Sequence, residues 1–203
     1  MLEKFKQDLI YCTYCPKLCR FACPVTNAEC RETVTPTGKL NLLDLVRKGA
    51  VELDEEIADV MYRCAGCLTC RAYCKHRVDV PAVIEHARAL AVNRGLEPPQ
   101  IEHHLDTFAE NRNPYGPALP GKIDSLDPAL RKHIGAKSDT LFFVGCTTLF
   151  HYPEIAASIG KMLDAAGIDF ALHADGQTLC CGTPALFSGV PREMLKNAKR
   201  LAD

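Results

Sequence analysis

Residues 64–74 read Cys64-Ala-Gly-Cys67-Leu-Thr-Cys70-Arg-Ala-Tyr-Cys74. The spacing is C-x2-C-x2-C-x3-C, which is typical of proteins that hold a [4Fe–4S] cluster. Three closely spaced thiolates can bind three corners of one cluster. In two-cluster ferredoxins the fourth cysteine of such a run ligates the other cluster. One run of this kind therefore predicts a second run elsewhere in the chain.

The second run lies nearer the amino terminus. Residues 12–24 read Cys12-Thr-Tyr-Cys15-Pro-Lys-Leu-Cys19-Arg-Phe-Ala-Cys23-Pro24. The middle spacer is three residues long, so the loop between Cys15 and Cys19 must accommodate one extra residue. Cys23 is followed by proline, as the pattern predicts, whereas Cys74 is followed by Lys75. Cys30 follows Cys23 in the sequence and is the obvious substitute if one of these cysteines does not bind a cluster.

The two runs predict two [4Fe–4S] clusters that exchange their last ligands. We expect one cluster on Cys12, Cys15, Cys19 and Cys74, and the other on Cys64, Cys67, Cys70 and Cys23. Zinc is one alternative, but a zinc site takes four ligands, and these runs offer twice that number at spacings that are not typical of zinc ribbons. A disulfide framework is the other alternative. It fits poorly, because nothing in the sequence indicates export to an oxidising compartment.

The composition is that of an ordinary globular chain. Of the 203 residues 47% are hydrophobic, and 24 Lys and Arg balance 25 Asp and Glu. A nucleic-acid-binding protein normally has a basic excess, so we expect no nucleic-acid partner. The first ten residues lack the apolar segment of a signal peptide, and no window approaches the roughly 18 apolar residues of a membrane span. The sequence therefore predicts a cytoplasmic protein, with any membrane contact made through a partner.

Residues 1–95 are expected to form a helical domain around the two clusters. Apolar residues recur there at helical spacing, and Pro, Gly and Asp mark the helix ends. Helices are expected over residues 1–10, 35–48, 54–62 and 79–93, with an irregular segment over residues 25–35. Residues 96–139 are rich in proline and are expected to be an irregular connector with one short helix near residues 102–110.

Residues 140–203 have an α/β pattern. The apolar run Leu141-Phe-Phe-Val144 predicts a buried parallel strand, and residues 169–174 predict a second one. Helices are expected over residues 153–166 and 191–203. Cys146 and the sequence Cys180-Cys181-Gly182 follow the two strands. Ligands in such folds lie beyond the carboxyl ends of the strands, so these cysteines form a second candidate site.

This order of motifs resembles the iron–sulfur subunit family related to heterodisulfide reductase. The same arrangement is seen in the iron–sulfur subunits of glycolate oxidase and of anaerobic glycerol-3-phosphate dehydrogenase. The resemblance implies an α+β chain: a helical two-cluster ferredoxin-like domain followed by an incomplete α/β cysteine-rich (CCG) domain. It assigns no catalytic residue.

A complete motif in that family continues to a further C-x2-C, whereas this sequence stops at Asp203. The resemblance therefore leads us to expect a carboxyl-terminal truncation. A third, non-cubane cluster on Cys146, Cys180 and Cys181 is expected only if the chain continues. The alternative is that these three are buried thiols.

The resemblance implies an electron-transfer subunit of a hetero-oligomeric oxidoreductase. Such a subunit would relay single electrons through two [4Fe–4S] clusters between a flavin-containing partner and an acceptor. One alternative is a catalytic subunit that reduces a heterodisulfide or a quinone at the cysteine-rich domain, and another is a zinc-stabilised interaction module. Basic residues near the cysteines would raise the cluster potentials or dock an acidic partner, unless they are simply a solvated face. They are Lys17, Arg20, Arg31, Arg63, Arg71, Lys75 and Arg77.

Overall fold

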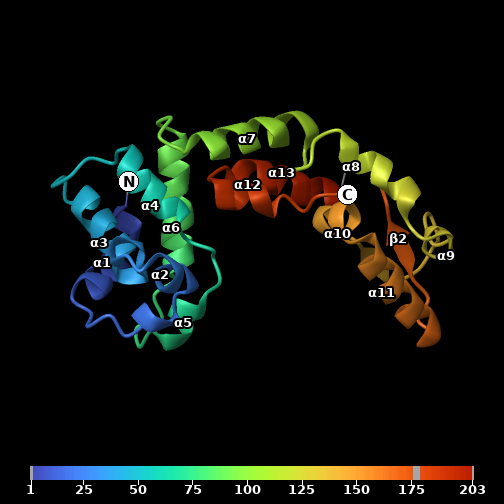
Figure 1. The fold of residues 1–203 in the computed structure, drawn as a ribbon, viewed down its shortest axis with the longest axis horizontal. Helices are drawn as coiled ribbons and strands as arrows, with labels where there is room; N and C mark the ends of the chain where they lie inside the picture. Colours follow the sequence, from blue (N-terminus) through green and yellow to red (C-terminus); the bar gives the residue numbers. More distant parts are fainter. Residues whose placement is uncertain (1, 176–178, 203) are drawn as a thin grey trace. The chain divides into compact units, whose positions relative to one another are not determined.

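The computed structural model describes residues 2–175 and 179–202 of the chain. These residues form two compact units. The first comprises Met1–Glu102 and Leu186–Pro191, and the second comprises His103–Ala185 and Arg192–Asp203. The helices and the two strands are drawn in Figure 1. The chain is thus mostly helical with a small parallel sheet, which confirms the α+β class.

The first unit is built on four helices that pack around a common apolar core, α1 against α3, α3 against α6, and α4 against α6. Buried side chains at helical spacing form this core, including Leu9, Leu40, Met61 and Ile84. Side chains of Thr35, Asp54 and Asp79 cap α3, α4 and α6 by accepting backbone N–H bonds. The helices are α1 (Lys6–Thr13), α2 (Pro24–Glu29), α3 (Pro36–Arg47), α4 (Glu55–Tyr62), α5 (Thr69–Tyr73) and α6 (Val80–Val92).

The second unit contains a two-stranded parallel sheet, β1 (Leu141–Phe143) and β2 (Ala171–His173). Phe142 pairs with Leu172, and the crossover between the strands contains α10 and α11. The core of this unit gathers Phe108, Leu149, Phe170 and other buried side chains. Its helices are α7 (Pro99–Asn111), which begins in the first unit, α8 (Ala118–Gly121), α9 (Pro128–Arg131), α10 (Cys146–His151), α11 (Pro153–Ala165), α12 (Thr183–Ser188), whose last three residues belong to the first unit, and α13 (Pro191–Ala202), whose first residue does.

Three local expectations need correction. Residues 25–35 are not irregular throughout, because Pro24 takes the first position of α2. Residues 96–139 contain α7, α8 and α9, because Pro99 and Pro128 begin helices rather than interrupt them. The first strand is not fully buried, since the side chain of Leu141 is 57% exposed.

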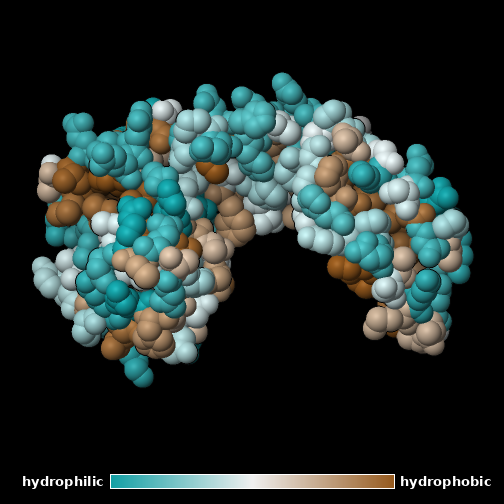
Figure 2. All heavy atoms as spheres, viewed as in Figure 1, coloured by the Kyte–Doolittle hydropathy of each residue, from teal (hydrophilic) through white to brown (hydrophobic). Residues whose placement is uncertain are grey.

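One face of the molecule shows how polar and apolar residues are distributed. In Figure 2 hydrophilic atoms cover most of the face shown, and apolar atoms form smaller separate areas. Across residues 2–175 and 179–202, no helix combines the length and the apolar character needed to cross a lipid bilayer.

Candidate functional site

The first cavity lies beside the first cysteine run and has a volume of about 340 Å³. Its lining includes Cys12, Cys15 and Cys19 from that run, together with Cys74 from the second run. Cys12 stands in the last turn of α1, and Cys74 caps the carboxyl end of α5. Apolar side chains such as those of Ile10, Leu18 and Val78 complete the wall. The structure therefore brings together cysteines from both runs.

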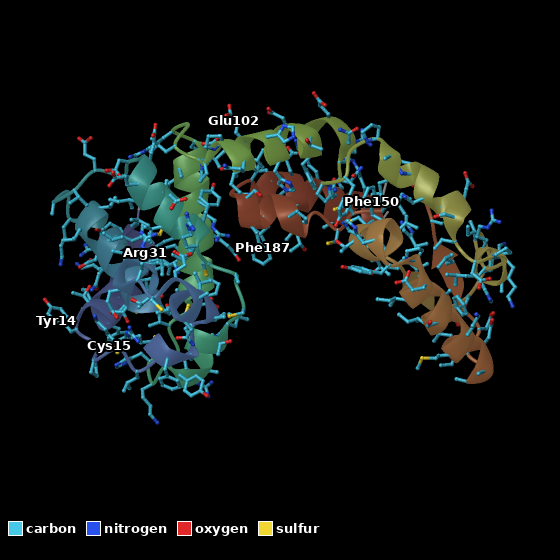
Figure 3. The ribbon with its side chains drawn as sticks, viewed as in Figure 1. Tyr14, Cys15, Arg31, Glu102, Phe150 and Phe187 are labelled. Atoms are coloured by element: carbon cyan, nitrogen blue, oxygen red, sulfur yellow. The ribbon has the colours of Figure 1, made fainter. Side chains whose placement is uncertain are left out.

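The loop between Cys15 and Cys19 accommodates its extra residue at Lys17. Lys17 adopts a left-handed backbone with φ 64°, which costs a non-glycine residue about 1–2 kcal/mol. Tyr14, just before this loop, points outward in Figure 3 and is 80% exposed. Strained backbone of this kind is concentrated at functional sites.

The second cavity is lined by Cys64, Cys67 and Cys70 from the second run and by Cys23 from the first. It is smaller, at about 20 Å³. Cys70 and Val80 line both cavities, so the two share a wall. The backbone turns around this site through left-handed residues at Gly66 and Leu68, with φ 65° and 61°.

Burial changes the acidity of these thiols. The pKa of Cys12 is raised from 9.0 to about 12, first by burial and then by the charges of Cys19, Cys74 and Cys15. The pKa of Cys70 is raised to about 12, first by burial and then by the charges of Cys19, Cys64 and Cys67. The Thr69 hydroxyl, 3.3 Å from the Cys67 sulfur, lowers the pKa of Cys67 instead. A cluster needs thiolates, so its assembly must release protons from Cys12 and Cys70.

We predict that the free energy of unfolding of the cluster-free protein falls as the pH rises above 9. The unfolded thiols lose their protons near pH 9, whereas the folded Cys12 and Cys70 keep theirs until about pH 12. Each of these thiols should lower stability by about 1.4 kcal/mol per pH unit in this range. Urea titrations between pH 8 and 11 measure the effect.

The contribution of Tyr62 to this pH dependence must be separated from that of the thiols, because burial raises the pKa of Tyr62 from 10.0 to about 12. The variant Tyr62→Phe removes this contribution. A stability that does not change with pH in Tyr62→Phe would contradict the burial of the two thiols.

Both cavities suit a [4Fe–4S] cluster by their donor set, since five cysteines line the first, four line the second, and apolar side chains complete both walls. The first also has the space. The second is narrower, at about 20 Å³, so its walls must move apart when a cluster binds. Zinc fits less well, because four thiolates must converge about 2.3 Å from a single ion. Within the described residues, no group of three or more Cys, His, Asp or Glu side chains is arranged to hold one ion.

Cys30 lies apart from both cavities. It is exposed, ends α2 in a left-handed conformation, and contacts the carbonyl oxygen of Asn27 at 3.6 Å. It lines neither of the two cavities described above. All twelve cysteines are free thiols in this structure.

The three carboxyl-terminal cysteines lie in the second unit. Cys146, at the start of α10, and Cys180 are buried, and a hydrogen bond between their thiols lowers the pKa of Cys146 and raises that of Cys180. Cys181 is exposed and contacts the Thr183 hydroxyl at 3.2 Å. The structure thus pairs two of the three thiols directly.

The glycine that follows Cys181 is required by packing. Gly182 has φ 86°, and a Cβ there would lie 2.7 Å from the Cα of Met194 in α13. The Asn197 side chain of the same helix donates to the carbonyl oxygens of Cys180 and Arg112 at 3.3 and 2.9 Å. Helix α13 therefore fixes the backbone of the Cys180-Cys181-Gly182 sequence.

The basic residues near the cysteines are largely paired with carboxylates, as in the solvated face that the sequence left open. Five of the seven are in ion pairs: Lys17 and Arg20 with Glu32, Arg31 with Glu29, Arg63 with Glu29 and Asp59, and Arg71 with Asp79. These pairs are largely exposed, so their charges are screened by solvent.

Sequence reasoning missed two buried cations. Lys39 in α3 is 1% exposed and lines the second cavity, and Arg88 in α6 is 4% exposed. Both follow the apolar spacing of their helices, since Lys39 lies four residues before Leu43 and Arg88 four residues after Ile84. A charged residue on the apolar stripe of a helix was the available signal.

Two families of known domains match the chain. Residues 8–78 match the 4Fe-4S dicluster domain, and residues 140–203 match the Cysteine-rich domain. Each match contains one of the cysteine groups described above. No solved structure shows a significant match to the chain.

Several curated proteins are similar to it. A dihydromethanophenazine:CoB--CoM heterodisulfide reductase subunit of Methanosarcina mazei is 23% identical over 150 residues, which cover 70% of this chain and 36% of that protein. The EtfAB:quinone oxidoreductase of Syntrophomonas wolfei is 23% identical over 79% of this chain and 22% of its own length. The probable glycolate oxidase iron-sulfur subunit of Bacillus subtilis is 30% identical over 40% of this chain and 18% of its own length.

The chain therefore spans only about a third or less of the length of these relatives. Within it, the dicluster cysteines come first and the cysteine-rich domain second. The chain contains a 4Fe-4S dicluster domain and a Cysteine-rich domain, and it is similar to iron–sulfur proteins related to heterodisulfide reductase.

Proposed function

We propose that this chain is an electron-transfer subunit that relays single electrons through two [4Fe–4S] clusters between a flavin-containing partner and an acceptor. The observation that carries the proposal is the pair of adjoining cavities, each lined by at least four cysteines drawn from both runs. A cluster held by thiolates changes charge by one electron with little rearrangement, and the protein sets its potential. The proposed domains are residues 1–95, a connector over 96–139, and a cysteine-rich domain over 140–203.

The shared wall supports transfer between the two sites. Cys70 and Val80 line both cavities, so two clusters bound there would be neighbours with no solvent layer between them. Exposed side chains at the first site, including Tyr14 and Leu18, would let a partner approach it closely. The protein's role in this scheme is to hold the thiolates, to exclude water and to accept a redox partner.

The proposal includes a partner protein, because an electron carrier to which no catalytic residue is attributed needs another subunit to supply or receive its electrons. The names of its relatives refer to a heterodisulfide reductase, a quinone oxidoreductase and a glycolate oxidase, all of which catalyse electron transfer. We propose membership of a comparable hetero-oligomeric oxidoreductase, in which a flavoprotein supplies or receives the electrons.

A second candidate function is reduction of a heterodisulfide or a quinone at the cysteine-rich domain. The hydrogen-bonded thiols of Cys146 and Cys180, with Cys181 following directly, favour it. It would require a further cluster, whose ligands would include these three residues. Metal content above that of two cubanes would support this second role.

The first test is the iron and sulfide content of anaerobically purified protein. We expect about eight atoms of each per chain, with visible absorption that bleaches on reduction and EPR signals from reduced clusters. Zinc in place of iron would give a colourless, EPR-silent protein and would contradict the proposal. About four atoms of each would mean that one of the two sites does not bind a cluster.

A further inference from the structure

The two cavities differ in the charges around them. Lys39 lines the second cavity, and its ammonium group donates to the carbonyl oxygen of Val34 at 2.5 Å. Arg88 donates to the carbonyl oxygens of Met61, at 3.0 and 3.1 Å, and of Cys64, at 2.6 Å. A fourth bond joins it to the carbonyl oxygen of Phe187, at 2.8 Å. Arg88 thus holds the backbone of a proposed cluster ligand.

Neither buried cation has an anionic partner among the described residues. All their hydrogen bonds in that part of the chain go to neutral carbonyl groups, and no carboxylate lies within 4.0 Å of either. Glu29 lies near enough to influence Lys39, but it pairs with Arg31 and Arg63. Buried charges are normally paired, since an unpaired ion in a low dielectric is strongly unfavourable.

The cysteines of the second cavity can supply the missing counter-charge once they are deprotonated as cluster ligands. The charges that favour protonated Lys39 come first from Cys64 and then from Cys23. Those that favour protonated Arg88 come first from Cys64 and then from Tyr62 and Glu85. Burial alone lowers the pKa of both groups. A thiolate-ligated cluster carries net negative charge, which increases by one on reduction. The negative charge of the cluster would offset the free-energy cost of burying the two cations.

The first cavity has no comparable pair in the described part of the chain. The ionisable nitrogen groups in its lining are Lys75 and His76, and both are exposed. Exposed charges act through water and are screened, so they change a nearby potential less than buried ones. The difference in buried positive charge between the two cavities is not cancelled by a difference in solvent exposure. Cys12 and Cys19 of the first set are buried, whereas Cys67 of the second set is exposed.

We propose that Lys39 and Arg88 are the counter-charges of a cluster in the second cavity and make it the more readily reduced of the two clusters. This inference rests on the proposed function. It gives the relay a direction. One electron from a reduced donor, such as a flavin, enters the first-cavity cluster and then passes to the second-cavity cluster, which is reduced as the first is reoxidised. Arg88 also acts as a positioning residue, because it fixes the carbonyl of Cys64.

The test is a redox titration of the full-length, anaerobically purified protein, followed by EPR. In the variant Lys39→Met we expect the reduced-to-oxidised ratio of one cluster to fall at least about tenfold at a fixed potential, which is about 59 mV for a one-electron couple. The other cluster should be unchanged. The control is Lys48→Met, which makes the same substitution at the end of the same helix, where Lys48 is 46% exposed and paired with Asp44. It should change either ratio less than about twofold.

A second arm does not depend on substituting Lys39. Loss of Cys12 and Cys74 should leave only the second-cavity cluster, and loss of Cys23 and Cys67 should leave only the first-cavity cluster. We expect the remaining cluster of the first variant to be reduced at the higher potential. Equal or reversed potentials would overturn the inference while leaving two bound clusters intact. A wild-type protein without iron and sulfide would instead overturn the proposed function.

Discussion

Replacing Cys12 and Cys74 together with alanine should leave about four of the roughly eight iron atoms per chain. The two residues belong to different runs but line the same cavity, so their loss should remove one cluster and spare the other. The matched pair is Cys12→Ala with Cys23→Ala, which lie in one run but line different cavities. That pair should damage both sites and leave little iron. Iron and sulfide analysis of the two anaerobically purified variants measures the difference.

The opposite pattern would contradict the exchange of ligands between runs. If each run held its own cluster, the loss of Cys12 and Cys23 would spare one cluster, and the loss of Cys12 and Cys74 would damage both. The control for a nonspecific effect is Cys30→Ala, because Cys30 is exposed and lies outside both cavities. Its iron content should equal that of the unmodified protein.

Much of this arrangement could be predicted from the sequence because cysteine spacing is a local property. A C-x2-C turn forces two sulfurs onto one side of a short loop whatever the rest of the chain does. The family and the α+β class could also be predicted, since the cysteine motifs and the apolar periodicity both occur in continuous stretches. The helix ends at Thr35, Asp54 and Asp79 were predictable for the same reason, as each is fixed by a side chain within one turn.

Features that depend on tertiary packing were not predictable in this way. The burial of Lys39 and Arg88 depends on which helices meet, and a long cationic side chain on a helix normally reaches solvent. The pairing of Cys146 with Cys180 joins residues on either side of a strand crossover. The proline-rich segment was misjudged because proline is common both in loops and at the first position of a helix. Only the flanking structure decides between these two.

The packing of residues 186–191 in the first unit leads to the final prediction. Gly189 has φ 101°, and a Cβ there would lie 2.8 Å from both the carbonyl carbon and the carbonyl oxygen of Arg88. Neither backbone atom can move without disturbing α6. Phe187 projects from α12 in Figure 3, and its ring would lie 3.1 Å from a Cβ placed on Gly66. The Tyr62 hydroxyl donates to the carbonyl oxygen of Ser188 at 3.0 Å. The segment therefore packs directly on the loop of Cys64.

Gly189→Ala should destabilise the first unit by about 3 kcal/mol, because it adds an overpacking cost to the strain of a left-handed backbone. The matched control is Gly95→Ala in the same unit, where φ is 65° and a Cβ would meet nothing within 4 Å. Strain alone should cost about 1 kcal/mol there. With a urea dependence of about 2 kcal/mol per molar, the unfolding midpoint of Gly189→Ala should lie about 1 M below that of Gly95→Ala. Equal midpoints would mean that residues 186–191 do not pack on α6. In that case Arg88 would lose its bond to Phe187 and with it part of the support for the Cys64 loop.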